Sequence, residues 1–379
     1  MTQEKPIESK ELESRRGMQL STRKSSATAI IKEITLPPGS ELCIARDKRH
    51  PDSFKLKCPV DQEGLPPRVR REVKGIQLDK EMIAPFRDVQ EIDGMVPDGS
   101  KIAFLPSEAK RERVQEHLDA TRVDDDDGKK REKGEDRDRG GTIFGTDDRY
   151  LFNDRSFPWR TTGLVRTAAG RCSGTMIGPR HVLTASHCIN WTSGGGAGWI
   201  TFTPGFFDGD EPWGEFAAVQ VAYWLQAPGS LTDQQTAFDY AVLILEQSIG
   251  DVIGYPGYRT YDDDWNGGTF WQYVGYPGEL AGGQRPAFQN DCVISSAQSQ
   301  SLSGNSALVL GHFNEFTPGQ SGGAVWGWWG SEPWPRVVGV GSTIGSTAVQ
   351  TPTGSTTGDN EYGGGSALSS LITWSRANF

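Results

Sequence analysis

Apolar and polar positions alternate in two different ways along this chain, and the change comes near residue 140. Beyond that point, short β-branched and aromatic runs are separated by Gly, Pro, Asn and Asp, which is the pattern of strands joined by turns. The predicted strands are 163–166, 173–177, 182–184, 199–202, 217–223, 240–245, 270–275, 292–296, 307–310, 323–327 and 337–342. About a dozen short strands without helical periodicity between them predict an all-β barrel or sandwich. One helix is predicted at the end, over residues 368–376.

The first 140 residues, called the leader below, have a weaker pattern. Residues 1–40 are charged and irregular, and we expect much of this stretch to be mobile. Strands are predicted at 41–46 and 101–105, and Ser107 could cap a short helix that runs to about residue 122. Residues 124–141 are so rich in charge and glycine that we expect a solvated linker open to proteases. The predicted domains are therefore a leader with its linker over 1–140 and a folded domain over 141–379.

Composition supports the same boundary, since all 12 tryptophans lie after residue 141 and every lysine lies at or before Lys133. Residues 141–379 carry 10 bases and 20 acids, whereas the leader carries 29 of each. An acidic, lysine-free domain disfavours nucleic acid as a partner. No apolar run approaches the roughly 20 residues that a membrane span requires, so we expect no membrane partner.

The five cysteines are an odd number, so at least one is unpaired or bonded to another chain. We expect Cys172 to pair with Cys188. Cys43 and Cys58 either close a loop in the leader and leave Cys292 free, or one of them pairs with Cys292. The cysteine spacings do not suit a metal site, and we expect no metal and no cofactor.

Two stretches carry the base and the carboxylate that acyl transfer by a serine requires. Residues 184–188 (TASHC) follow a predicted strand, and the expected disulfide would fix the loop that carries His187. Residues 238–245 (FDYAVLIL) place Asp239 at the start of an apolar strand. There its carboxylate can accept the Nδ1–H of His187 and stabilise the imidazolium. Alone, each residue has an ordinary structural explanation as a surface histidine or a turn aspartate.

A third stretch, residues 317–325 (TPGQSGGAV), supplies the nucleophile Ser321 in a glycine-rich turn. Glycine allows a tight turn in which the N–H groups of Gly319 and Ser321 converge on one point, as an oxyanion hole requires. A glycine-rich turn could be ordinary, but the order His, Asp, Ser along the chain favours a catalytic triad.

These residues resemble the chymotrypsin-like (trypsin-like) serine peptidases. The nearest likeness is to their V8-like, or glutamyl-endopeptidase, branch, through residues 145–149 (GTDDR) and 275–278 (GYPG), and it covers residues 142–379. It implies two six-stranded antiparallel β-barrels with a C-terminal helix, preceded by a smaller, partly disordered pro-region. The implied protein is a secreted endopeptidase that acts on proteins or peptides without a cofactor. The alternative is a catalytically silent binding protein on the same fold, and the presence of all three triad residues weighs against it.

The same likeness places Ser342 beside Asp239 and implies that Val340, Gly341 and Ser342 form one wall of the substrate channel. Most trypsin-like zymogens pair a new N-terminal amine with an aspartate directly before the nucleophile. This chain has Gln320 there, so that switch is not available.

The expected floor of the primary pocket is Glu315, six residues before Ser321. An acid there would favour Arg or Lys side chains of the substrate, unless Glu315 turns to solvent and Phe316 closes the pocket. The glutamate-specific branch is expected to carry a histidine in place of Gly341 and a small hydroxyl residue in place of Phe316. These two positions therefore do not predict glutamate preference.

The leader is expected to act on its own domain, as an intramolecular chaperone or inhibitor that is removed by cleavage between Lys129 and Gly141. Residues 1–23 are polar and lack the apolar segment of an export signal. The resemblance nevertheless implies an extracellular protein, whose export signal is not visible in this sequence.

Overall fold

The computed structural model describes residues 4–15, 20–21, 45–47, 50–55, 71–121, 143–227, 231–330, 332–350 and 356–379. Contacts divide the chain into two units, residues 23–70 and the remainder. In the smaller unit, strands β2 (Ala45–Asp47) and β3 (His50–Lys55) pair in antiparallel fashion. Cys43, Cys58 and the linker 124–141 lie outside the described residues. Of residues 1–40, much of which we expected to be mobile, only 4–15 and 20–21 are described, and 4–15 contain a short helix.

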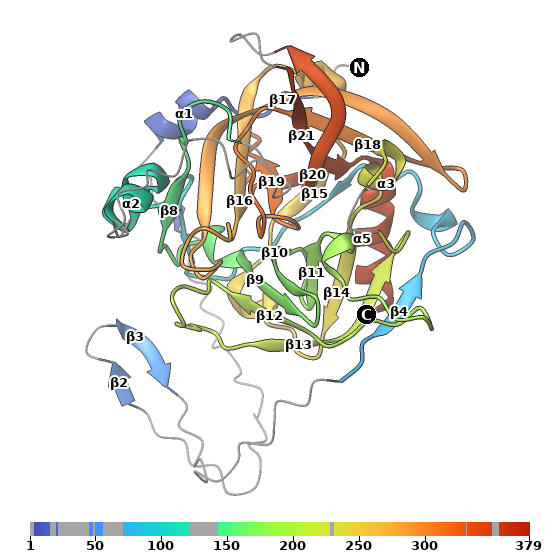
Figure 1. Cartoon of the computed structure of the whole chain (residues 1–379). Helices are drawn as coiled ribbons and strands as arrows, with labels where there is room; N and C mark the ends of the chain where they lie inside the picture. The colour runs from blue at the N-terminus through green and yellow to red at the C-terminus, as the bar shows by residue number, and fades with distance from the viewer. Residues whose placement is uncertain are drawn as a thin grey trace, which may run out of the picture. The chain divides into compact units, whose positions relative to one another are not determined.

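The first barrel contains six antiparallel strands, green to yellow in Figure 1, in the order β12-β9-β10-β11-β14-β13. It closes because β12 also pairs with β13. The strands are β9 (Thr162–Thr167), β10 (Gly170–Met176), β11 (His181–Thr184), β12 (Ile200–Pro204), β13 (Phe216–Tyr223) and β14 (Ala241–Leu245). All five residues of β14 are buried, which explains why this apolar run was recognisable in the sequence.

The second barrel also contains six antiparallel strands, in the order β16-β19-β20-β21-β18-β17, and closes where β16 pairs with β17. The strands are β16 (Thr269–Gly275), β17 (Ala287–Leu302), β18 (Asn305–His312), β19 (Ala324–Gly327), β20 (Arg336–Gln350) and β21 (Thr356–Gly364). Helix α5 (Ser366–Asn378) follows, with Leu368, Leu371 and Ile372 buried. The predicted fold class, two six-stranded antiparallel barrels with a C-terminal helix, is confirmed.

Two strands are much longer than predicted: β20 covers 15 residues where 337–342 was expected, and β17 is the other. We expected a strand over 292–296, but β17 has 16 residues, because it pairs with β16 through one part and with β18 through the other. Its second half is rich in exposed Ser and Gln, so backbone pairing formed a strand that the apolar pattern did not reveal. The remaining short elements of this part of the chain are β8 (Tyr150–Phe152), η3 (Trp159–Thr161), η4 (Ser186–Cys188), α3 (Asp233–Ala237), α4 (Gly250–Ile253), β15 (Gly257–Arg259) and η5 (Asp263–Trp265).

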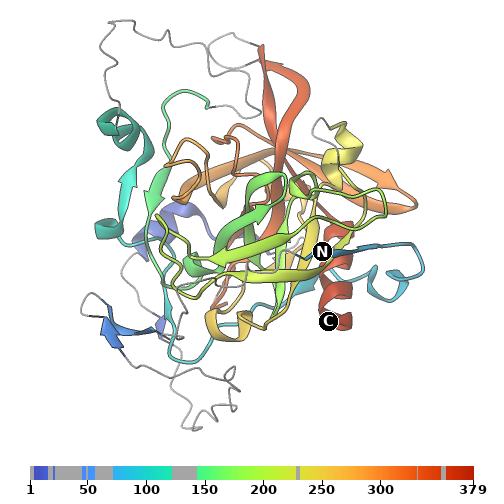
Figure 2. The same cartoon turned by 60° about the horizontal axis from the view of Figure 1, so that its bottom comes forward.

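The leader adds strands to both of the sheets that form the barrels. Its elements are α1 (Ser9–Ser14), β1 (Leu20–Ser21), β4 (Lys74–Gln77), η1 (Ala84–Phe86), β5 (Glu91–Ile92), β6 (Lys101–Ile102), η2 (Glu108–Lys110), β7 (Arg111–Arg113) and α2 (Val114–Thr121). β4 pairs with β13, β5 with β15 and β7 with β8. Figures 1 and 2 both show the cyan segment of the leader beside the dark red helix α5, which η1 and β5 contact.

The helix that we expected from Ser107 begins only at Val114. Residues 111–113 pair with β8 instead, and Ser107 makes no capping hydrogen bond with its side chain. Helix propensity is a weak preference, and here a tertiary strand pairing overrides it.

Candidate active site

The imidazole of His187 is held by a buried carboxylate. His187 lies in η4, directly after β11, and Asp239 precedes β14, which is the neighbour of β11 in the sheet. The His187 Nδ1–H donates to Asp239 Oδ2 at 2.6 Å, and the His187 backbone N–H donates to Asp239 Oδ1 at 2.8 Å. The Ser342 hydroxyl donates to Asp239 Oδ2 at 2.6 Å. Three donors therefore fix a carboxylate that is completely buried.

This pairing changes how easily His187 accepts a proton. Burial by itself lowers the pKa of His187, but the charge of Asp239 and the hydrogen bond to it outweigh burial, and the pKa is raised above the ordinary histidine value. A histidine paired in this way is stabilised when it takes a proton, as a general base must be.

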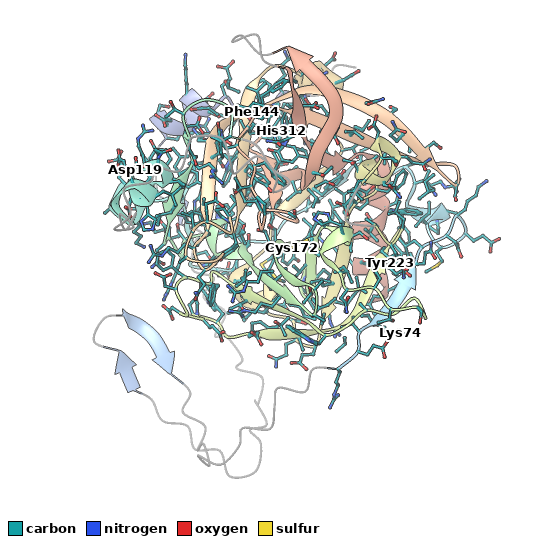
Figure 3. All side chains as sticks on the ribbon, in the orientation of Figure 1. Lys74, Asp119, Phe144, Cys172, Tyr223 and His312 are labelled. Carbon is teal, nitrogen blue, oxygen red and sulfur yellow. A yellow bond between two sulfur atoms is a disulfide. The ribbon has the colours of Figure 1, made fainter. Side chains whose placement is uncertain are left out.

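Ser321 lies beside the same end of the first barrel. Cys172 and Cys188 form a disulfide, which confirms the predicted pair; Figure 3 labels Cys172. The Cys188 sulfur lies 3.8 Å from His187 Nε2 and 3.9 Å from the backbone oxygen of Ser321. The Ser173 N–H also donates to that oxygen, at 2.8 Å. Ser321 is thus adjacent to the loop that carries His187, and only 8% of its surface is exposed.

The turn before Ser321 adopts the conformation that its glycines permit. Gly319 has φ +96°, and a Cβ there would lie 2.5 Å from the backbone oxygen of Tyr276. The Gln320 N–H donates to the backbone oxygen of Thr317 at 3.1 Å. Within the described ranges, the N–H groups of Gly319 and Ser321 donate to no other residue. Two backbone donors next to the serine are therefore available to a ligand.

A profile described as Trypsin matches residues 150–357, which is more than half of the chain. This chain belongs to the trypsin family. It is 35% identical to a glutamyl endopeptidase of Bacillus licheniformis over 156 residues, which cover 41% of this chain and 48% of the relative. This relative confirms the resemblance to the V8-like branch.

Two further relatives carry different descriptions. An extracellular metalloprotease of Bacillus subtilis is 29% identical over 143 residues, which cover 36% of this chain and 45% of that protein. An inactive serine protease 35 of Mus musculus is 40% identical over 62 residues, which cover 15% of this chain and 14% of that protein. The match thus spans about half the length of the two bacterial relatives.

The residues expected to line the substrate channel of this trypsin-family domain lie against one another. The Gly322 N–H donates to the backbone oxygen of Gly341, and the Gly341 N–H donates to that of Gly323, both at 2.8 Å. Val340 is buried and lies in the same strand, β20. A Cβ on Gly341 would lie 2.1 Å from Tyr273 Oη, so only glycine fits beside that hydroxyl.

The two residues at the expected floor of the primary pocket are both buried. Phe316 packs with its ring 5.9 Å from that of Tyr273. The Gln289 side chain donates to the Glu315 carboxyl, and the Glu315 N–H donates to Gln289 Oε1 at 3.0 Å. Burial, followed by the hydrogen bond and the negative charge of Asp148, raises the pKa of Glu315 to about 9. Glu315 is therefore neutral at pH 7, and this does not support our expectation that it attracts Arg or Lys side chains by charge.

Two groups of side chains in the described ranges have potential metal-ligand atoms within 4.8 Å of one another. One is His187 with Cys172 and Cys188, but sulfurs in a disulfide are not thiolates and cannot bind a metal in that form. The other is the surface run Asp262–Asp264, in which Asp262 Oδ1 already accepts the N–H of Asp264 at 3.0 Å. Cys292 is buried and not in a disulfide.

Sequence reasoning missed a buried arginine at the serine turn. All five N–H donors of Arg149 are used: two bind Asp147, one binds Glu279, and two bind Thr317 and Gln320. The sequence offered one indication, since Arg149 ends the GTDDR stretch that carried the V8-like resemblance.

Proposed function

We propose that this trypsin-family chain is a secreted serine endopeptidase that hydrolyses proteins or peptides through an acyl-enzyme. The observation that carries the proposal is the buried Asp239 carboxylate, which holds His187 in one orientation at 2.6 Å. In the proposed reaction the Ser321 hydroxyl attacks the peptide carbonyl and gives its proton to His187 Nε2. The N–H groups of Gly319 and Ser321 stabilise the oxyanion. His187 then protonates the leaving amine, and water releases the acyl group by the same steps.

A fluorophosphonate probe tests the nucleophile. The wild-type protein should become labelled on Ser321 and should digest a denatured protein substrate, and Ser321→Ala should lose both. The exposed Ser299→Ala is the matched control and should retain both, because Ser299 lies on β17 and not in the site. A folded wild-type protein that neither reacts nor digests would instead be a silent binding protein of this fold.

The pocket residues support a preference for uncharged side chains at the first position of the substrate. Glu315 is neutral and hydrogen-bonded to Gln289, and position 341 is a glycine rather than a histidine. Mass spectrometry of a digested protein mixture should therefore show no enrichment of Lys, Arg or Glu before the cleaved bond. Strong enrichment of any of the three would contradict this assignment.

Secretion and processing are part of the proposal. The Cys172–Cys188 disulfide suits an oxidising compartment. Among the described residues, no helix combines the length and the apolar character that a membrane crossing requires. We infer that processing cuts the linker between Lys129 and Gly141, because this charged, glycine-rich stretch is a suitable protease substrate. N-terminal sequencing of the active species tests the position, and an intact chain with full activity contradicts it.

A further inference from the structure

Arg149 joins the two ends of the turn that precedes the serine. Arg149 Nη1 donates to Gln320 Oε1 at 2.6 Å and to Thr317 Oγ1 at 2.9 Å. The Thr317 N–H also donates to Gln320 Oε1, at 3.0 Å. The peptide units between these two residues include the Gly319 N–H, and the next one carries the Ser321 N–H. The side chain of Arg149 therefore sets the shape of the segment that presents both free donors.

The charges around Arg149 explain why residue 320 is an amide. Asp147 Oδ2 and Glu279 Oε1 each lie 2.7 Å from Arg149 Nη2, so two carboxylates already neutralise the cation. Burial by itself lowers the pKa of Arg149, but these two acids outweigh it, and the guanidinium stays charged. A third carboxylate at position 320 would be buried without a cation of its own, which is costly. Gln320 accepts the same hydrogen bond without adding charge.

We propose that Arg149 is a positioning residue that holds the oxyanion turn in its working shape without a newly formed chain terminus. This inference rests on the proposed peptidase function. In trypsin-like zymogens, a freed N-terminal amine performs this anchoring at the residue before the nucleophile. Here an internal guanidinium occupies that position from residue 149, beyond the predicted cleavage region. The turn is therefore assembled before and after any cut in the linker.

The test uses the full chain and the variant Arg149→Met, which keeps much of the length and loses every hydrogen bond. We expect kcat to fall by about 10²-fold, the usual effect of losing one oxyanion donor, with KM changed less than threefold. Affinity for a peptide trifluoromethyl ketone, which forms the oxyanion on the serine, should fall by the same factor as kcat. Arg149→Lys keeps the positive charge but lacks the planar guanidinium with its five donors, and its kcat should lie between those of the wild type and Arg149→Met.

Arg336→Met is the matched control. Arg336 is also buried and also binds two acids, Glu332 at 2.6 Å and Asp93 at 2.9 Å, but it does not contact the serine turn. If Arg149→Met does not fold, Gln320→Met decides, because it leaves Arg149 with both of its acids and should lower kcat similarly. A folded variant of either residue with kcat within threefold of the wild type overturns the proposal. Failure of the wild type to react with the fluorophosphonate probe would instead overturn the peptidase function.

A second inference rests on different residues, those by which the leader joins the barrels. Beside its three strand pairings, the leader buries Leu12, Val73, Ile83, Ile102 and Val114. Its backbone oxygens accept hydrogen bonds from two buried side chains of the folded domain: Trp159 Nε1 donates to Ala103 at 2.8 Å, and Gln272 Nε2 donates to Phe104 at 3.0 Å. Loss of the leader would leave these polar atoms and apolar surfaces without partners.

The described parts of the leader lie away from the site. No hydrogen bond, ion pair or ring contact joins residues 4–15 or 71–121 to His187, Asp239 or Ser321 in the described part of the chain. We infer that the leader remains bound after the linker is cut, as a second polypeptide that completes both sheets. This role differs from that of a chaperone or inhibitor that leaves the domain after cleavage.

An engineered cut tests this inference without relying on activity. A recognition sequence for a sequence-specific viral protease replaces part of the linker, and the cut protein is passed over a size-exclusion column. Both fragments should elute together in native buffer and separately in denaturant. Ile102→Asp, which places a charge in the buried contact, should release the leader, whereas the exposed Lys101→Asp should not. A leader that elutes alone from cut wild-type protein overturns the inference.

Discussion

Breaking the Cys172–Cys188 disulfide should lower the free energy of unfolding by about 3 kcal/mol. The bond closes a loop with a sequence separation of 16 residues. The loop-entropy relation for a loop of this length gives about 3 kcal/mol at 25 °C. For a domain of 150–250 residues each kcal/mol shifts the midpoint by roughly 2–4 °C, so the expected drop is roughly 6–12 °C.

The perturbation is the double variant Cys172→Ala and Cys188→Ala, and the assay is thermal and urea unfolding with and without reductant. Cys292→Ala is the matched control, since Cys292 is a buried free thiol and its loss removes the packing of one sulfur and a hydrogen bond to the backbone oxygen of Gln289, but no disulfide. Reductant should lower the free energy of unfolding of the wild type and of Cys292→Ala, because both contain the disulfide. It should not change that of the double variant, which has no Cys172–Cys188 bond to reduce. A double variant with the same free energy of unfolding as the oxidised wild type would refute the reasoning.

The same variant separates stability from catalysis. His187 keeps its two hydrogen bonds to Asp239, and Ser186 Oγ still donates to the backbone oxygen of Leu225 at 2.6 Å. These contacts hold the imidazole without the disulfide. We therefore expect kcat at 25 °C to fall by less than about tenfold, the factor that corresponds to 1.4 kcal/mol in the barrier.

Three further predictions concern charge and space in the site. Asp239→Asn should lower kcat by roughly 10⁴-fold. In the wild type, the acid limb of the pH profile of kcat/KM should lie above about pH 6.5, since Asp239 raises the pKa of His187. An acid limb well below that pH would contradict the pairing. Glu315→Gln should stabilise the protein near pH 8 and have little effect near pH 5, as measured by urea unfolding, because the folded state raises the pKa of Glu315 to about 9. Between about pH 4.3 and about pH 9 the folded state therefore holds one proton more than the unfolded state, and the free energy of unfolding falls as pH rises through this window. Equal effects of the substitution at both pH values would exclude a buried neutral acid. Gly341→Ala should lower the unfolding midpoint, because its Cβ would lie 2.1 Å from Tyr273 Oη, and adding Tyr273→Phe should recover part of the loss; the absence of any recovery would place the strain elsewhere.

Local patterns were sufficient to predict an all-β fold and most of the strands of residues 141–379, but not β21. Buried strands such as β14 are continuous apolar runs, and turn residues mark where they end, so strands could be predicted one at a time. The candidate triad was recognisable for a similar reason, since each of its residues sits in a short motif with a special local requirement. Gly319 with φ +96° is one example. Polar strands such as the second half of β17 contain no continuous apolar run and were not predicted.

The sequence by itself determined which residues could act: a histidine between a strand and a cysteine, an aspartate before an apolar strand, and a serine among glycines. Only the tertiary structure decided what surrounds them. Arg149 meets Gln320 across 171 positions, and Glu315 becomes neutral because folding buries it beside Asp148. β4 of the leader completes the first sheet beside β13 through backbone hydrogen bonds. The physical reason is that burial, charge pairing and backbone pairing between distant segments depend on the folded chain, and they leave no periodic signal in the residues that take part.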